Sequence, residues 1–228
     1  GYQAGDNAST LGSSVGIGYQ AMGGATGSLL TGANATVAIG TLAWGYADGN
    51  TGNGVYIGYK AGAYDTNGGN TAIGYRAMEV ASGSTMTQNT AVGTNAMHNI
   101  SYANSNSNVA IGYNALKGGA VTGAVQYNIA IGGSNLYQIT SGTNNVAIGG
   151  NSVLSALTSG ASNVAISRGA GQSITTTSEC ILIGADAGNL LNGTGPNGSI
   201  AIGKAALSVH TDGARNIAIG WEAMHDTN

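Results

Sequence analysis

Short segments that alternate large hydrophobic and small residues recur along the whole chain. The clearest copy is Asn-Val-Ala-Ile-Gly-Tyr-Asn-Ala-Leu, at residues 108–116. Aligned on the glycine of this motif, the chain shows twelve repeats whose anchor residues are 16 to 22 positions apart. The anchors are Gly18, Gly40, Gly58, Gly74, Gly93, Gly112, Gly132, Gly149, Ser167, Gly184, Gly203 and Gly220. A period of this length is typical of a solenoid.

The residues just before each anchor have the period of two that is typical of a β-strand. A β-branched residue stands three positions before every anchor, and Ile or Val92 stands one position before it. We call these two sets the β-branched columns. The position between them, the alanine column, holds Ala in nine of twelve repeats. The two sets therefore lie on opposite faces of the strand.

The β-branched face is predicted to form the core, because stacked coils would merge it into one continuous interior. Its representative residues are Val109, Ile111, Ile129, Ile131, Val146 and Ile148. The alanine column is then expected to face outward, where a long apolar stripe would be an aggregation liability on a monomer. We therefore expect a parallel homotrimer, in preference to a dimer, with an interface made of Ala38, Ala72, Ala91, Ala110, Ala130, Ala147, Ala165, Ala201 and Ala218.

A repeat of this length accommodates two short strands and two turns, and the anchor glycine permits a positive φ at one of them. The prediction is an all-β solenoid of about twelve coils that fills residues 1–228 as one domain, a fragment that begins within a repeat. Asparagine precedes the strand in seven repeats, and stacked amides of this kind can form a hydrogen-bonded ladder. These residues are Asn70, Asn89, Asn108, Asn128, Asn145, Asn163 and Asn216.

Composition fits a thin, layered β structure. The chain has 41 Gly, no Phe, one Pro and 7 % charged residues, which argues against a thick globular core. Six Lys and Arg residues are spread without a basic stripe, which argues against nucleic acid as a partner. No apolar run is long enough to insert in a membrane. The single cysteine, Cys180, is expected to be a small buried hydrophobe.

The acidic and histidine residues do not predict an enzyme. His98 and His225 are seven coils apart, and the remaining histidine is His210. Asp186 and Glu222 lie two coils apart, a separation open to a pair of glycosidase carboxylates, but no aromatic subsite or cleft accompanies them. We expect no catalytic residue, no metal and no cofactor.

Aromatic residues follow the anchor directly in six places, and we call this set the aromatic column. Aromatic side chains beside a turn suit contact with sugars or proteins, although packing on neighbouring coils or chains is the more common reason for such positions. The column consists of Tyr2, Tyr19, Tyr59, Tyr75, Tyr113 and Trp221.

The motif Asn-Val-Ala-Ile-Gly-x-x-Ala resembles the head repeat of trimeric autotransporter adhesins of the YadA-like kind, and its Tyr-Asn-Ala-Leu extension resembles repeats of phage tail fibres. The resemblance implies a left-handed parallel β-roll and a homotrimer on a virion or bacterial surface. It also implies attachment to a host or cell-surface glycan or protein receptor. Ser167 in the anchor column, and Tyr56 and Leu182 in the alanine column, depart from the pattern.

The sequence therefore predicts a non-enzymatic extracellular fibre or adhesin segment. A self-assembling filament subunit joined end to end is the alternative, because an open terminal coil offers unpaired strand edges. An ice-binding solenoid is disfavoured by the uneven repeat length.

Overall fold

The chain folds as a β-solenoid. The computed structural model describes residues 3–4, 12–23, 34–46, 52–80, 85–100, 103–191, 197–209 and 213–225. These residues form twelve β-strands joined by turns, with no helix among them that could cross a membrane. The chain divides into two compact units, Gly1–Asn114 and Ala115–Asn228, and the same repeat builds both.

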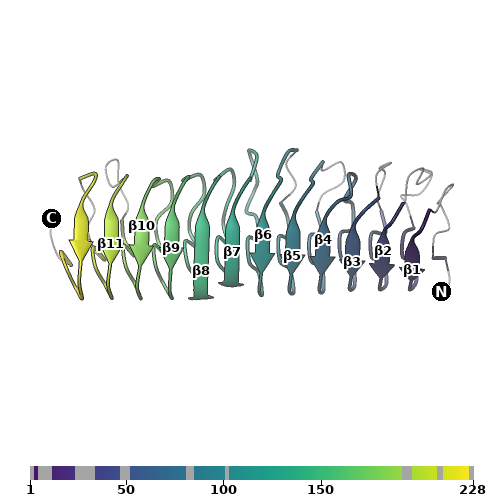
Figure 1. Cartoon of the computed structure of the whole chain (residues 1–228), viewed down its shortest axis with the longest axis horizontal. Coiled ribbons are helices and arrows are strands. Elements are labelled where there is room, and N and C mark those ends of the chain that lie inside the picture. Colours follow the sequence, from purple (N-terminus) through teal and green to yellow (C-terminus); the bar gives the residue numbers. More distant parts are fainter. Residues whose placement is uncertain are drawn as a thin grey trace. The chain divides into compact units, whose positions relative to one another are not determined.

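Each unit contains six short parallel strands that lie side by side in chain order (Figure 1). The first unit holds β1 (Val15–Ile17), β2 (Val37–Ile39), β3 (Val55–Ile57), β4 (Thr71–Ile73), β5 (Thr90–Val92) and β6 (Val109–Ile111). The second holds β7 (Ile129–Gly133), β8 (Val146–Asn151), β9 (Val164–Ile166), β10 (Ile181–Ile183), β11 (Ile200–Ile202) and β12 (Ile217–Ile219).

Neighbouring strands within a unit pair equivalent positions of the repeat. Val15 lies opposite Val37 in the first unit, and Ile200 lies opposite Ile217 in the second. β7 and β8 add the pair Gly133–Asn151 beyond a shift in register. The predicted strand before each anchor and its in-register stacking are therefore confirmed within each unit. The second strand expected in each repeat does not form in the described residues, where turns follow the anchor.

The predicted assignment of the two strand faces is wrong. The alanine column faces the interior of the coil, and its side chains are buried in Ala38, Ala72, Ala91, Ala110, Ala130, Ala147, Ala165, Ala201 and Ala218. The β-branched columns face outward, and they are half-buried or exposed in Val109, Ile111, Ile129, Ile131, Val146 and Ile148. Because the alanines are enclosed within their own coils, they cannot form the oligomer interface that the sequence suggested.

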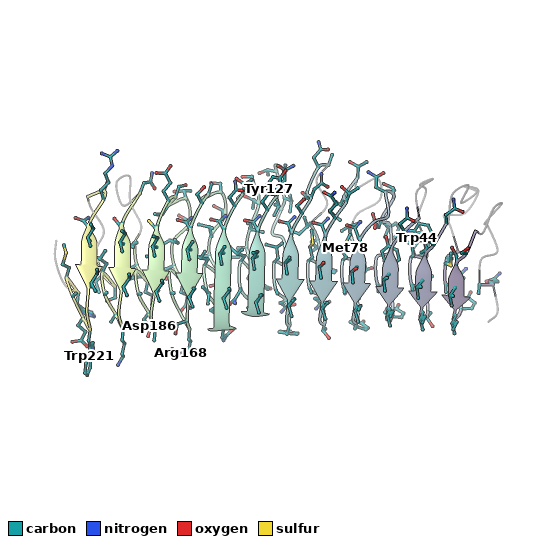
Figure 2. The ribbon with its side chains drawn as sticks, viewed as in Figure 1. Trp44, Met78, Tyr127, Arg168, Asp186 and Trp221 are labelled. Carbon is teal, nitrogen blue, oxygen red and sulfur yellow. The ribbon has the colours of Figure 1, made fainter. Side chains whose placement is uncertain are left out.

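The narrow interior of the coil explains this orientation. Four positions after the anchor, most coils place one large side chain that is buried opposite the alanine. Trp44 and Met78, labelled in Figure 2, are two of the largest fully buried side chains. One such side chain fills the space between the walls, so the strand can contribute only a small residue. Close packing of this kind leaves no room for an inward Ile or Val.

The two large residues of the alanine column show the same constraint from the other side. Tyr56 and Leu182 are fully buried, and in their coils the position four after the anchor is Gly62 or Gly188. A Cβ at Gly62 would collide with the Tyr56 ring, and a Cβ at Gly188 would lie 2.6 Å from Leu182 Cδ2. Large and small residues have therefore exchanged walls in these two coils, which accounts for the departure of Tyr56 and Leu182 from the repeat pattern.

The anchor glycines have the positive φ that the sequence predicts in ten of the twelve repeats, as at Gly93 with φ 132°. A Cβ on Gly93 would also lie 2.6 Å from the carbonyl oxygen of Gly112 in the next coil. Ser167 takes a φ of 99° at the corresponding position, whereas Gly149 is not among the positive-φ residues. Glycine is therefore favoured at this position both by φ and by the close approach of neighbouring coils.

The residues after the anchor form the wall of the coil opposite the strand, and residues with positive φ alternate there with residues outside that region. In the coil of β4, Arg76 and Met78 have φ of 54° and 55°. The Arg76 N–H donates to the Tyr59 carbonyl of the preceding coil, and the Met78 N–H donates to the Ala96 carbonyl of the following coil. This wall is thus bonded in both directions, and burial of the Met78 side chain helps to offset the cost of a left-handed residue.

The predicted asparagine ladder is confirmed for Asn70, Asn89 and Asn108 in the first unit and for Asn128, Asn145 and Asn163 in the second, whereas the backbone N–H of Asn216 donates to Ser199 Oγ instead. In the first unit, Asn89 Nδ2 donates to Asn70 Oδ1 (3.2 Å) and Asn108 Nδ2 donates to Asn89 Oδ1 (3.0 Å). In the second, Asn145 donates to Asn128 and Asn163 donates to Asn145, each at 3.0 Å. The next position of the ladder is Cys180, whose backbone N–H donates to Asn163 Oδ1 and whose thiol is buried as expected.

Adjacent residues on opposite faces of β6 provide a test of the corrected orientation. We expect Ala110→Asp to remove the β signal of the first unit from the far-ultraviolet circular dichroism spectrum, because it puts a charge into a closed interior at a cost of several kcal/mol, roughly 3 or more. Ile111→Asp puts the same charge at a site 39 % exposed and should retain the signal. The reverse order of damage would restore the orientation that the sequence suggested.

Exchange of volume between the walls can be tested in the coil of β10. Leu182→Ala should destabilise the second unit by about 2–5 kcal/mol through a cavity. Gly188→Leu should destabilise it by about 1–3 kcal/mol through overpacking. The double variant has the Ala and Leu arrangement of Ala201 and Leu207 in the next coil, so it should be more stable than either single variant. Additive losses in chemical denaturation would show that the two positions do not share one space.

Candidate functional site: the aromatic column and its charged neighbours

The five described members of the aromatic column are exposed: Tyr19, Tyr59, Tyr75, Tyr113 and Trp221. Tyr2 lies outside the described residues. The column directly follows the anchor, where the chain leaves the strand and enters the wall with alternating handedness. Its side chains therefore stand on the surface at the same end of each strand, as Figure 2 shows for Trp221 of the second unit.

Tyr59 and Tyr75 form a pair across adjacent coils. Their ring centroids are 5.3 Å apart and their planes differ by 16°, so the rings are stacked. Lys60 Nζ lies 5.8 Å from the centroid of Tyr59, within the range of a cation–π contact. A second stack, Tyr46 on Tyr64, lies on the coils of β2 and β3. The two tyrosines therefore pack on each other across adjacent coils and are still exposed on the surface.

A charged cluster lies beside this pair. Glu79 Oε1 is 3.2 Å from Lys60 Nζ, and Glu79 Oε2 contacts Arg76 Nε. Glu79 Oε2 is also 3.8 Å from His98 Nε2. The carboxylate is largely buried, with 10 % of its side chain exposed, whereas Lys60 and Arg76 retain 25 % and 38 %. The His98 side chain is itself buried against this cluster.

The cluster keeps both cations charged. Burial works to lower the pKa of Lys60, but the hydrogen bond and charge of Glu79, together with Tyr59 and Tyr64, raise it above its ordinary value. The hydrogen bond to Glu79 raises the pKa of Arg76, with smaller contributions from Tyr75 and Tyr59. Two fixed positive charges therefore stand next to the stacked rings at neutral pH.

The second unit has simpler contacts at the same end of its strands. Lys204 Nζ lies 5.4 Å from the ring centroid of Trp221. Arg168 and Asp186, labelled near one another in Figure 2, form an exposed ion pair at 3.4 Å. An exposed pair of this kind contributes little to stability.

The candidate catalytic residues are dispersed over the structure. Asp186 forms its ion pair with Arg168, while Glu222 is exposed on the coil of β12. His225 lies at the end of the described part of the chain, and His210 falls outside it. No three His, Cys, Asp or Glu side chains of the described residues are grouped as metal ligands would be.

A buried polar cluster inside the first unit was not predicted from the sequence. Asp65 Oδ2 accepts hydrogen bonds from the Tyr56 hydroxyl (2.6 Å) and from Asn70 Nδ2 (2.8 Å). The backbone carbonyl of Asp65 accepts a further hydrogen bond from Trp44 Nε1 (3.0 Å). Because Asn70 is the first asparagine of the ladder, Asp65 caps that ladder. Burial raises the pKa of Asp65 from 3.8 to about 6, although the hydrogen bonds from Tyr56 and Asn70 work to lower it.

Comparison of the chain with protein-family models, with curated proteins and with solved structures gives no significant match. The resemblance to adhesin heads and tail fibres therefore rests on the repeat motif.

Sequence reasoning identified the exposed aromatics but missed the charged residues beside them. Lys60 and Arg76 share the position two after the anchor in consecutive coils, and Glu79 lies three residues beyond Arg76. Two like charges at the same position of consecutive repeats were the feature of the sequence from which this charged cluster could have been predicted.

Asp65 makes a testable prediction for pH dependence. Its pKa is raised in the folded state, so the folded chain binds more protons between about pH 4 and 6 and its stability falls as pH rises through that window. The loss is about 3 kcal/mol and is complete above the folded pKa. Asp65→Asn should remove this loss from thermal melts of the first unit, whereas Asp186→Asn, on the surface of the second unit, should not. If Asp65→Asn lost stability over this pH window just as the parent chain does, the loss would not come from a raised pKa of Asp65.

Proposed function

We propose that this chain is a non-enzymatic segment, shaft or head, of an extracellular fibre or adhesin on a virion or bacterial cell surface. The observation that carries the proposal is the outward β-branched face, which repeats in every coil. Apolar residues are exposed there at both ends of the described chain, with Ile17 at 54 % and Ile219 at 68 %. A repeated apolar stripe of this kind is a typical protein interaction surface.

The occupant that best fits the stripe is a second and a third copy of the same chain. Identical stripes with the same repeat can pack in parallel, each coil against the equivalent coil of its neighbours. A parallel homotrimer would remove the Ile and Val side chains from water, at about 25 cal/mol for each Å² of apolar surface. This is the trimer that the adhesin resemblance implies, together with its left-handed coil. The interface is assigned to the β-branched columns, since the alanine column is enclosed.

Attachment is assigned to the aromatic column, which lies outside the β-branched face. The exposed aromatic residues of this column suit weak contacts with a cell-surface glycan or protein receptor, and many weak contacts on one fibre bind with avidity. The carboxylates and histidines have structural or surface roles in this proposal.

Light scattering and sedimentation velocity test the assembly. The parent chain should be a monodisperse trimer at micromolar concentration. The double variant Ile131→Glu, Ile148→Glu should give a folded monomer, because like charges would meet around the three-fold axis. The control Gln138→Glu alters an exposed residue away from the strands and should stay trimeric. A monomeric parent would refute the trimer, a dimer would refute the three-fold axis, and polymers of mixed length would favour the end-to-end filament.

A further inference from the structure

The stacked tyrosine pair and its two cations form a distinct surface of the first unit. Tyr59 and Lys60 follow β3, and Tyr75 and Arg76 follow β4. Two of the six Lys and Arg residues of a chain with a net charge of -3 are thus on neighbouring coils beside one exposed aromatic pair. We call these four residues the Tyr–Lys–Arg patch.

Glu79 positions the cations of the patch without masking them. Its carboxylate lies beneath both, less exposed than either, and it engages Arg76 through Nε, one of five N–H donors on the guanidinium. One carboxylate between two cations leaves a net charge of +1. The patch therefore offers an ordered positive surface, and Glu79 lowers the entropy that Lys60 and Arg76 would lose on binding a ligand.

The tyrosine pair lies between two small residues in its column. The Lys60 N–H donates to the Thr41 carbonyl, so Thr41 precedes Tyr59 by one coil in the column. The Asn95 N–H donates to the Tyr75 carbonyl, which places Thr94 one coil beyond Tyr75. Both threonines are exposed. The tyrosine pair is thus flanked along the column by hydroxyl groups rather than by further rings.

We propose that the Tyr–Lys–Arg patch binds an acidic polysaccharide through a sugar that carries a carboxylate. The C–H face of a sugar ring can pack on the tyrosines, its hydroxyls can bond to the threonines, and its carboxylate can pair with Arg76 and Lys60. The inference deepens the proposed function and rests on it, because it names the ligand class of the attachment surface. Aromatic faces beside cations favour a sugar acid over an acidic peptide, whose carboxylates would use the cations alone.

Four polymers that differ in charge and in sugar content test the ligand class. Binding of the intact chain to polygalacturonate and to polysialic acid is measured by biolayer interferometry, beside polygalacturonate with its carboxylates methyl-esterified. Polyglutamate serves as the acidic chain without sugar. At least one acidic polysaccharide should bind, roughly tenfold or more tighter than the methyl ester and than polyglutamate, and added salt should weaken the binding.

Matched variants locate the site. Arg76→Gln, Lys60→Gln and Tyr75→Ala should each weaken the binding by roughly tenfold. The control is Lys117→Gln, which removes the same charge from a lysine that lies over the single ring of Tyr137, at 5.3 Å. It should bind like the parent. Circular dichroism on each variant verifies that the first unit remains folded.

Several outcomes would overturn the inference. They are no binding to either acidic polysaccharide, equal binding to the methyl ester, equal binding to polyglutamate, or the same loss in Lys117→Gln as in Lys60→Gln. Sedimentation of the same samples separates this failure from that of the proposed function, because a trimer without polysaccharide binding leaves the fibre proposal standing.

Discussion

The width of the coil interior is the constraint on which the rest of this structure depends. One large side chain fits between the two walls, so the strand contributes Ala, or Gly16 in the first coil, where the opposite wall contributes Met, Leu or Trp. Where the strand contributes Tyr56 or Leu182, the opposite wall contributes Gly62 or Gly188. In the coil of β9 both walls are small, and Leu154 and Leu182 of the adjacent coils fill the space beside Gly171. The large β-branched residues are therefore excluded from the interior and become the surface. A protein with so small a core depends on contacts between coils for its stability.

The contacts between coils are of two kinds, and both require exact repetition. Backbone hydrogen bonds run from the strand and from the wall with alternating handedness, while the asparagine side chains satisfy donors and carbonyls inside the turn. Asp65 joins this network by accepting a hydrogen bond from Asn70 and one from Tyr56. The surface columns inherit the same register, and this is why Tyr59 stacks on Tyr75 and why Lys60 and Arg76 meet at Glu79. The candidate site is thus a by-product of the stacking.

The sequence was sufficient for the strands, the anchor turns, the ladder and the exposed aromatic column, because each is a repeated pattern with a local cause. It was not sufficient for the direction of the strand faces, since a period of two separates the faces without saying which one is inside. Hydrophobicity favoured the β-branched face, and packing volume decided against it. The exchange of large and small residues at Tyr56 with Gly62 was the readable sign. The Asp65 cluster had no such sign, because its carboxyl comes from a variable turn.

The asparagine ladder also has a direction. In each ladder pair, the later asparagine donates through Nδ2 to the Oδ1 atom of the preceding asparagine. The Nδ2 atoms of Asn89 and Asn145 also donate to a backbone carbonyl of the following coil. Each of these hydrogen bonds joins two adjacent coils. Duplication or loss of a whole repeat in the gene would leave the remaining joints intact. The length of such a protein can then change in single-coil steps during evolution, while changes of a few residues are confined to the variable turns.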